Sequence, residues 1–238
     1  MTSNKTVFFI IGNLLIILGV FMLLPYWVQI LYEESSHSFL SSSFITILIG
    51  ALFVLANLQE EYRLNLKQTF LFSTFAWISI AGFGALPFIL SDIDFSISDS
   101  FFESMSGITT TGSTVVANLD SSPKSILMWR AIMQWLGGVG IIVMAITVLP
   151  LLKVGGMQLF KIESSDKPEK ILPRTSQIAF IIITTYLVLT FCCAFFYKIL
   201  GMSFFDSIAH AMTTIATGGF STHNDSIGYF NSSNIEIT

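Results

Sequence analysis

Charged residues are scarce in this chain. Of its 238 residues, 15 are Asp or Glu and 11 are Lys or Arg, together 11%. A soluble domain carries about 25% charged residues. The charges are too few to cover a water-facing surface, and a disordered chain needs high charge with low hydrophobicity. The net charge of −4 offers no basic surface to nucleic acid. The composition therefore excludes soluble globular, disordered and nucleic-acid-binding proteins.

Cysteine is also scarce. The two cysteines, Cys192 and Cys193, are adjacent in an apolar run. Neighbouring residues of one helix point in different directions, so neither a disulfide nor a metal site is expected from this pair. Both are expected to be small apolar packing residues. No other pattern in the sequence indicates a cofactor.

Long apolar runs, in contrast, are abundant. Hydrophobic residues make up 53% of the chain, and 23 residues are Phe. A membrane helix needs about 20 consecutive residues with few or no charges. Five stretches meet this requirement: Thr6–Tyr32, Ser35–Gln59, Gln68–Ser91, Ala131–Leu152 and Thr175–Tyr197. The fold class expected is an all-α polytopic membrane protein.

The basic residues predict the orientation. Eight of the eleven fall on one side of the predicted spans: Lys5, Arg63, Lys67, Lys153, Lys161, Lys167, Lys170 and Arg174. The opposite side collects the acids Glu33, Glu34, Asp92, Asp94, Asp99, Asp120, Asp225 and Glu236. Because cytoplasmic loops carry an excess of Lys and Arg, the N-terminus is expected to be cytoplasmic.

Two further segments, Ser96–Thr114 and Phe204–Thr222, are too short to span a bilayer. Each has about ten helix-compatible residues followed by small polar ones. Ten helical residues cover only about 15 Å. Segments of this length are expected to be re-entrant or interfacial, and irregular backbone at membrane depth must be buried in protein or line a cavity. Both lie on the predicted outer side.

The two short segments repeat each other at an offset of 107 residues. The matched pairs are Asp99 and Asp206, Ser100 and Ser207, Met105 and Met212, Ile108 and Ile215, Thr110 and Thr217, and Gly112 and Gly219. Repetition at a fixed offset indicates a repeated structural unit. The predicted organisation is two N-terminal helices (1–67), a first helix–pore loop–helix repeat (68–152), a cytoplasmic loop (153–174), and a second repeat without its closing helix (175–238).

The turns that end the short segments suit a cation. A dehydrated cation needs oxygens in place of its water, as backbone carbonyls supply in potassium filters. Glycine permits the dihedral angles that aim carbonyls at one point, and a helix C-terminus directed at the ion adds favourable negative potential. The acidic outer side would concentrate cations. The alternative is that Gly, Ser and Thr only allow close helix packing.

Several motifs resemble the Trk/Ktr/HKT family of cation transporters, in particular its bacterial TrkH branch. They are Ser104–Thr114 as a first pore loop, Trp129-Arg130 with Gln134–Gly140 in the next helix, Gly155–Phe160 with Glu163 in the following loop, Pro173-Arg174, and Thr214–His223 as a second pore loop. The resemblance covers nearly the whole chain.

The resemblance implies potassium uptake through a carbonyl-lined selectivity filter in the bacterial inner membrane. It implies potassium-channel-type helix–pore loop–helix repeats, four around one pore, after two extra N-terminal helices. The implied filter residues are Thr110, Thr111, Gly112, Thr217, Gly218 and Gly219. Glycine at 112, where sodium-preferring plant relatives have serine, favours potassium. The implied partners are potassium, membrane lipid, a second copy in a homodimer, and a cytosolic nucleotide-binding regulator of the TrkA type.

The chain departs from the family pattern in length. It contains two pore loops rather than four, and half a ring would leave filter backbone exposed to lipid. We therefore expect an N-terminal portion that is completed by the remaining repeats or by a complementary half. The alternative is a non-transporting truncated or assembly subunit with vestigial pore loops. Neither hypothesis involves covalent chemistry, so an enzyme is not expected.

Four other patterns have competing interpretations. Arg130 is expected to pair with Glu103 and support the first pore helix. Ser106 and His210 are the residue types of a serine protease, but each matches a pore-helix position of the other repeat. Gly137–Gly140 has no preceding strand, so close packing is expected rather than dinucleotide binding. The charged loop from Lys161 to Arg174 is either a solvated connector or a docking surface for a regulator.

Overall fold

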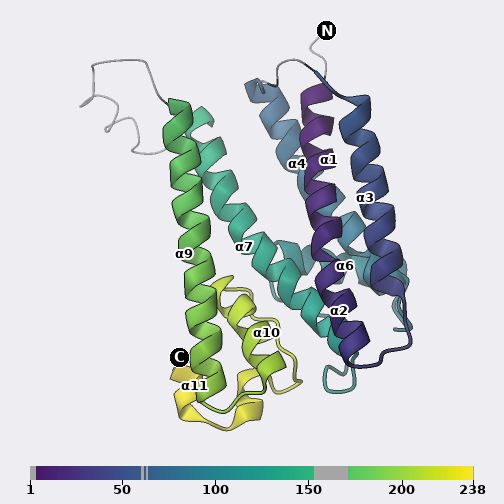
Figure 1. Ribbon diagram of the computed structural model, residues 1–238, viewed down its shortest axis with the longest axis vertical. Coiled ribbons are helices and arrows are strands. Elements are labelled where there is room, and N and C mark those ends of the chain that lie inside the picture. The colour runs from purple at the N-terminus through teal and green to yellow at the C-terminus, as the bar shows by residue number, and fades with distance from the viewer. Residues whose placement is uncertain (1–3, 60–61, 63, 153–170, 238) are drawn as a thin grey trace, which may run out of the picture.

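The computed structural model describes residues 4–59, 62, 64–152 and 171–237, and helices dominate this part of the chain (Figure 1). The elements are α1 (Lys5–Phe21), α2 (Leu23–Leu31), α3 (Ser38–Ala56), α4 (Leu66–Gly84), α5 (Leu86–Ile89), α6 (Ile97–Ile108), α7 (Lys124–Leu152), α9 (Ile171–Ile199), α10 (Phe204–Ile215), the 3₁₀ helix η1 (Ser226–Phe230) and α11 (Ser233–Ile237). The all-α fold class is confirmed. The loop is predicted at residues 153–174, of which residues 153–170 lie outside the described part of the chain.

Five helical stretches are long and apolar enough to cross a membrane: Lys5–Leu31, Ser38–Ala56, Leu66–Ile89, Lys124–Ile142 and Gln177–Ile199. Their number matches the sequence prediction. Two of them are interrupted, between α1 and α2 and between α4 and α5. Pro25 and Pro87 follow these breaks. Proline has no N–H to donate to the carbonyl four residues earlier, which explains both interruptions.

The fourth span begins earlier than the charge pattern predicts, at Lys124 rather than Ala131. Two contacts outside the span account for this difference. Glu34, in the turn between α2 and α3, accepts a hydrogen bond from the Ser125 N–H at 3.1 Å. A carboxylate at a helix N-terminus satisfies free N–H groups and interacts favourably with the helix dipole. Arg130 lies within the helix because Glu103 pairs with it.

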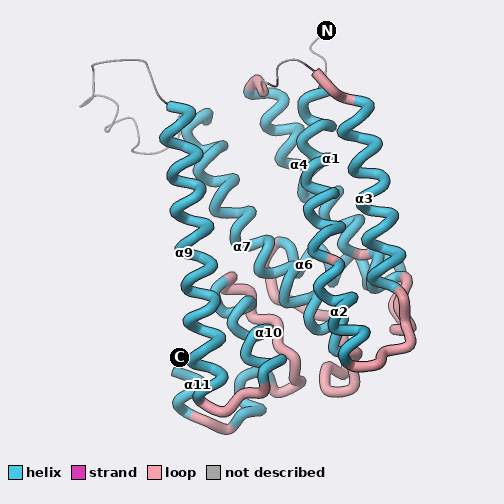
Figure 2. Tube along the Cα trace, in the orientation of Figure 1, coloured by secondary structure: helices cyan, strands magenta, loops and turns pink. Residues whose placement is uncertain are grey.

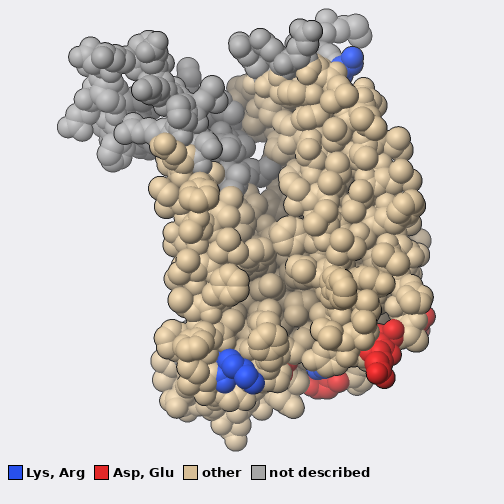
Figure 3. Space-filling view, in the orientation of Figure 1, with Lys and Arg blue, Asp and Glu red and all other residues tan. Residues whose placement is uncertain are grey.

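The long helices form two groups that meet at α7. Helices α1, α3 and α4 pack together, and α9 and α10 lie on the other side of α7 (Figure 1). Loops gather at the end of the molecule that carries α10 and the start of α7 (Figure 2). The visible sides are almost free of charge, and the coloured charged groups lie at the two ends (Figure 3). This distribution is that of a protein whose flanks face lipid.

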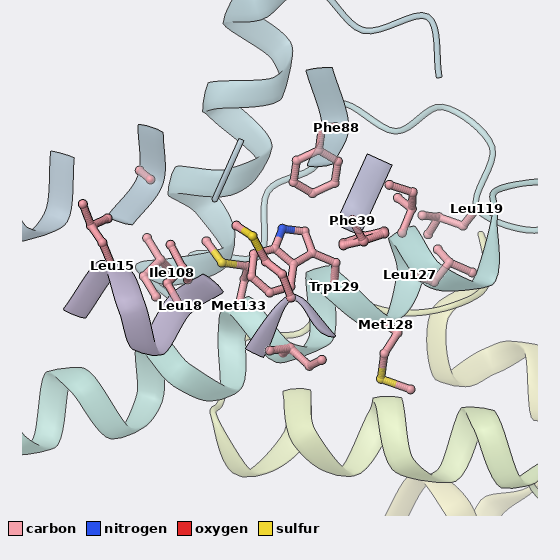
Figure 4. Close-up of a cluster of buried hydrophobic side chains, with 14 of the residues drawn as sticks. Leu15, Leu18, Phe39, Phe88, Ile108, Leu119, Leu127, Met128, Trp129 and Met133 are labelled. Atoms are coloured by element: carbon pink, nitrogen blue, oxygen red, sulfur yellow. The ribbon is translucent and has the colours of Figure 1, made fainter. Parts of the chain in front are cut away.

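Apolar packing around Trp129 fixes the position of α7. Trp129 is fully buried beside Met133 of its own helix and among Phe39 of α3, Phe88 of α5 and Ile108 of α6 (Figure 4). Its indole N–H donates to the Gly84 carbonyl at 2.9 Å. Because α4 ends at Gly84, this bond also satisfies a carbonyl that lies where the helix hydrogen bonding is interrupted. The N-terminal half of α7 is thus held against both the N-terminal helices and the first short helix.

The short helices α6 and α10 have 12 residues each, a length of about 18 Å. Both begin with the same cap at the 107-residue offset. The Ser96 hydroxyl accepts from the Asp99 N–H at 3.1 Å, and the Ser203 hydroxyl accepts from the Asp206 N–H at 3.0 Å. The repeat seen in the sequence is therefore also a repeat of local structure, and both segments have the predicted short helix.

Removal of either cap should destabilise the protein modestly. We expect Ser96→Ala and Ser203→Ala each to cost about 1 kcal/mol, because each leaves a free N–H at a helix start. Thermal unfolding in detergent measures the effect, and Ser41→Ala at an exposed position of α3 is the control. Equal melting temperatures for the cap variants and the control would contradict this prediction.

Candidate ion-conducting site

The first short helix ends in a tight backbone turn. The Thr110 N–H donates to the Gly107 carbonyl at 3.0 Å, and the Thr111 N–H donates to the Ser106 carbonyl at 3.0 Å. This pair of bonds is the Schellman arrangement, which satisfies the last carbonyls of a helix. Its left-handed residue is usually glycine, but here it is Thr110, with φ of 56°.

The second short helix ends in the same way. The Thr217 N–H donates to the Thr214 carbonyl at 2.9 Å, and the Gly218 N–H donates to the Thr213 carbonyl at 2.9 Å. Thr217 is the left-handed residue, with φ of 54°. All four residues are displaced by 107 from those of the first turn, so the two turns are structural copies.

After each turn, the extended backbone has a second residue in the left-handed conformation. Gly112 has φ of 79° and Gly219 has φ of 78°. Each strand therefore has left-handed residues at alternate positions, first a threonine and then a glycine. A β-branched residue at positive φ is rare and costs on the order of 1–3 kcal/mol. Two copies of this costly conformation, at matched positions, indicate that the backbone shape itself is needed.

The two strands lie against each other. A Cβ atom on Gly112 would be 2.1 Å from the Gly218 carbonyl oxygen. Residues 106 positions apart in the chain are thus in direct backbone contact. We call residues 110–112 the first strand and residues 217–219 the second strand. The two groups of residues that the sequence predicts for the filter thus meet at Gly112 and Gly218.

Helix α7 contacts both pore loops through one face: Gln134 reaches the strands themselves, and the other residues reach the short helices or the residues that follow the strands. The residues involved are Arg130, Gln134, Gly137 and Gly138, spaced by four, three and one positions, as residues on one helix face are. A Cβ on Gly137 would be 2.0 Å from the Ile108 carbonyl oxygen, at the end of α6. The expected close packing at this glycine is confirmed.

Gly138 makes the matching approach to the second short helix. Its Cβ would be 3.1 Å from Cα of Ala216, the residue that ends α10, and 2.5 Å from the Tyr186 hydroxyl. Gly140, by contrast, has no neighbouring atom within 4 Å. The glycine pair at 137 and 138 therefore lets α7 contact the C-terminal ends of both short helices.

Arg130 and Glu103 form the ion pair expected from the sequence. The Arg130 Nε lies 2.6 Å from Glu103 Oε1, and their side chains are 1% and 0% exposed. Arg130 also donates to the Ser221 carbonyl at 2.9 Å and to the Thr114 hydroxyl at 3.1 Å. Its guanidinium lies over the Phe220 ring, 4.0 Å from the centroid. Arg130 thus links the residues that follow the first strand to the residues that follow the second strand.

Each short helix also holds the residues that follow its own strand. Glu103 accepts from the Thr114 hydroxyl at 2.9 Å and from the Val115 N–H at 3.0 Å. His210 occupies the matched position in α10, and its Nε2 lies 3.0 Å from the Ser221 hydroxyl. Because His210 Nδ1 contacts the Asp206 carbonyl at 2.9 Å, Nδ1 donates and Nε2 accepts.

Ser106 and His210 therefore have partners within their own repeats. The Ser106 hydroxyl donates to the Ser113 carbonyl at 2.5 Å, and His210 is hydrogen-bonded as described above. Nucleophilic catalysis requires the base within hydrogen-bonding reach of the hydroxyl. The hydrogen bonds of the described residues assign both side chains to support of the pore loops.

The sequence analysis did not predict the role of Gln134, which bonds the second strand. Its Nε2 donates to the Gly218 carbonyl at 2.8 Å, and its Oε1 accepts from the Phe220 N–H at 3.0 Å. A polar residue within a predicted span was the available signal, but its partner is 84 residues away. The Gly218 carbonyl, expected to face an ion, already accepts this hydrogen bond.

A histidine links the loops on the side where the short helices begin. His223 Nδ1 lies 2.7 Å from Asp120 Oδ1, and its Nε2 lies 3.5 Å from Asp206 Oδ1. The ring stacks on Tyr229 with centroids 3.5 Å apart. The hydrogen bond from His223 lowers the pKa of the Asp120 carboxyl. This carboxyl therefore keeps its negative charge to lower pH than a free aspartate does.

The chain matches known proteins along most of its length. Residues 35–238 match the family model TrkH, described as "Cation transport protein". The Trk system potassium uptake protein TrkH of Vibrio parahaemolyticus is 40% identical over 237 residues, which cover 98% of this chain and 49% of that protein. The protein of the same name from Escherichia coli is 42% identical over 230 residues, which cover 95% of this chain and 48% of that protein.

A solved structure has the same arrangement of helices. The crystal structure of the potassium transporter TrkH from Vibrio parahaemolyticus superposes with a TM-score of 0.88 at 37% sequence identity. The match covers 99% of this chain and 48% of that one. The chain therefore spans about half the length of the relatives that it matches.

Proposed function

Because this chain belongs to the TrkH family of cation transport proteins, we propose that it supplies two pore loops of a potassium uptake pathway. The observation that carries the proposal is the matched pair of strands, each with left-handed threonine and glycine. Strained backbone of this kind is retained at functional sites. A filter of backbone oxygens is the function that such strands suit best. The family consists of transporters rather than enzymes.

The proposed filter is lined by oxygens of Thr110, Thr111, Gly112, Thr217, Gly218 and Gly219. Five of these carbonyls accept no hydrogen bond from the described residues, so they are free to replace water around potassium. The Gly218 carbonyl accepts one hydrogen bond from Gln134 and keeps a second lone pair for the ion. The short helices direct their C-terminal, partly negative ends at the same region, which stabilises a cation.

Two strands make half of a ring. We propose that two further repeats complete the pore, either in the remainder of a longer chain or in a complementary half. A homodimer and a cytosolic nucleotide-binding regulator of the TrkA type belong to the same proposal. The loop expected to meet that regulator lies at residues 153–174, mostly outside the described part of the chain.

The proposed location is the bacterial inner membrane, with a cytoplasmic N-terminus. The start of α1 and the end of α7 lie at one end of the molecule, and α10 lies toward the other end (Figure 1). We propose that Asp120 and Asp206, which contact His223, form the acidic mouth of the pore on the side of α10. The positive-inside rule assigns the end that carries Lys5 to the cytoplasm. The acidic mouth then faces outward, where it attracts cations before they enter.

Potassium uptake by the complete protein tests this proposal. Bacteria without their own potassium uptake systems should grow at limiting potassium when they express the complete protein that contains this chain. Rubidium uptake by the same cells gives the initial rate, and residues 1–238 expressed alone are the comparison. A complete protein that reaches the membrane but carries no potassium would support the alternative, a non-transporting subunit with vestigial pore loops.

A further inference from the structure

Gln134 is fully buried and uses both ends of its amide on the second strand. Its donor binds the residue before Gly219 and its acceptor binds the residue after it. Gly219, which has the left-handed φ of 78°, is therefore held between two hydrogen bonds from one side chain. We infer that Gln134 positions the second strand and thereby determines the ion selectivity of the pore. This inference rests on the proposed function.

The amide also fills the space of a missing side chain. A Cβ on Gly218 would lie 2.3 Å from Gln134 Cδ and 2.4 Å from its Oε1. The matched residue of the first strand is Thr111, which has a side chain of its own, with its hydroxyl 2.8 Å from that of Thr109. Among the described residues, the Thr111 side chain thus bonds within its own repeat, whereas the Gly218 backbone bonds a helix of the preceding repeat.

Selectivity depends on this support because the two strands touch. The Gly218 oxygen that Gln134 holds lies 2.1 Å from the position that a Cβ on Gly112 of the first strand would occupy. Rotation of that peptide would move oxygens of both strands relative to the ion. Discrimination between potassium and sodium depends on the number and placement of such oxygens. Loss of Gln134 should therefore alter selectivity more than total transport.

Two substitutions at Gln134 test the inference in the complete protein. Gln134→Glu keeps the shape and the acceptor for the Phe220 N–H, and in its ionised form it has no proton to donate to the Gly218 carbonyl. Gln134→Leu removes both bonds. Gln29→Leu is the control, since Gln29 is also buried and its amide bonds only Ser38 among the described residues, far from the strands. Proteoliposome flux, normalised to reconstituted protein, gives the potassium-to-sodium ratio.

We expect both Gln134 variants to lower that ratio at least fivefold and the control to leave it unchanged. A double variant tests the geometry. Gly218→Ala in the wild-type background should lower the ratio strongly because its Cβ meets the amide, whereas in a Gln134→Ala background the same substitution should cause little further loss because the amide is gone. A Gly218→Ala effect that depends on the side chain at 134 shows that the two residues act together on the strand, which a general loss of stability would not produce.

Two results would overturn the inference. If the wild type selects potassium and the Gln134 variants keep its ratio while only total flux falls, Gln134 is structural and the proposed function stands. If the wild type carries neither ion, the proposed function fails and this inference fails with it.

Discussion

Arg130→Gln is expected to destabilise the protein by about 3–5 kcal/mol, the usual cost of leaving one partner of a buried ion pair alone. The Glu103 carboxylate would remain fully buried with only the Thr114 hydroxyl and the Val115 N–H as donors. The Ser221 carbonyl would also lose its donor. Thermal unfolding and the amount of protein in the membrane measure the effect.

The double variant Glu103→Gln with Arg130→Gln should recover much of this loss, because no unpaired charge remains buried. Lys67→Gln, at an exposed lysine, is the control for loss of a positive charge. If Arg130→Gln lost transport at unchanged melting temperature and membrane level, Arg130 would act on the ion, and its role as a support for the pore helix would be wrong.

Gly112→Ser is expected to reduce potassium-over-sodium selectivity about tenfold, which corresponds to about 1.4 kcal/mol of differential binding. Two effects combine at this position. The residue has φ of 79°, which a serine adopts only with strain, and its Cβ would lie 2.1 Å from the Gly218 oxygen. The strands must therefore separate, which moves filter oxygens away from a potassium ion. Ion ratios in flux assays measure the change.

Serine substitutions at two other glycines serve as controls that separate backbone strain from the clash with the Gly218 oxygen. Gly201 also has positive φ, 111°, but no atom lies within 4 Å of its Cβ position. Gly82, in α4, has neither constraint. Serine at either position should leave the ion ratio unchanged. An unchanged ratio in Gly112→Ser as well would show that residues 110–112 do not form the filter.

Helix α7 belongs to the first repeat but contacts the pore loops of both repeats. Its N-terminal half carries the arginine, the glutamine and the two glycines that contact both short helices and the chain that follows both strands. The first repeat therefore supports the second through α7, and Asn224 and His223 of the second repeat bond the loop that precedes α7. Substitutions on this face of α7 should consequently affect the second strand most.

Much of the architecture followed from local features of the sequence. The five spans follow from charge-free apolar runs, since the bilayer sets helix length. The two turns follow from threonine and glycine at matched positions, because few backbone conformations end a helix in so few residues. The start of α7 was mispredicted since Arg130 and Lys124 interrupt the apolar run, and the groups that neutralise Arg130 or cap the helix lie elsewhere in the chain.

The sequence alone thus determined the class of protein, the number of spans and the repeat, and it predicted the filter residues. Only the tertiary structure decided how these strands are held. Gln134 and Gly218 are 84 residues apart, and Arg130 and Ser221 are 91 apart. Local patterns reflect the bilayer and the backbone, which act on every segment separately. Contacts across such distances depend on the packing of α7 between two repeats, which no single segment encodes.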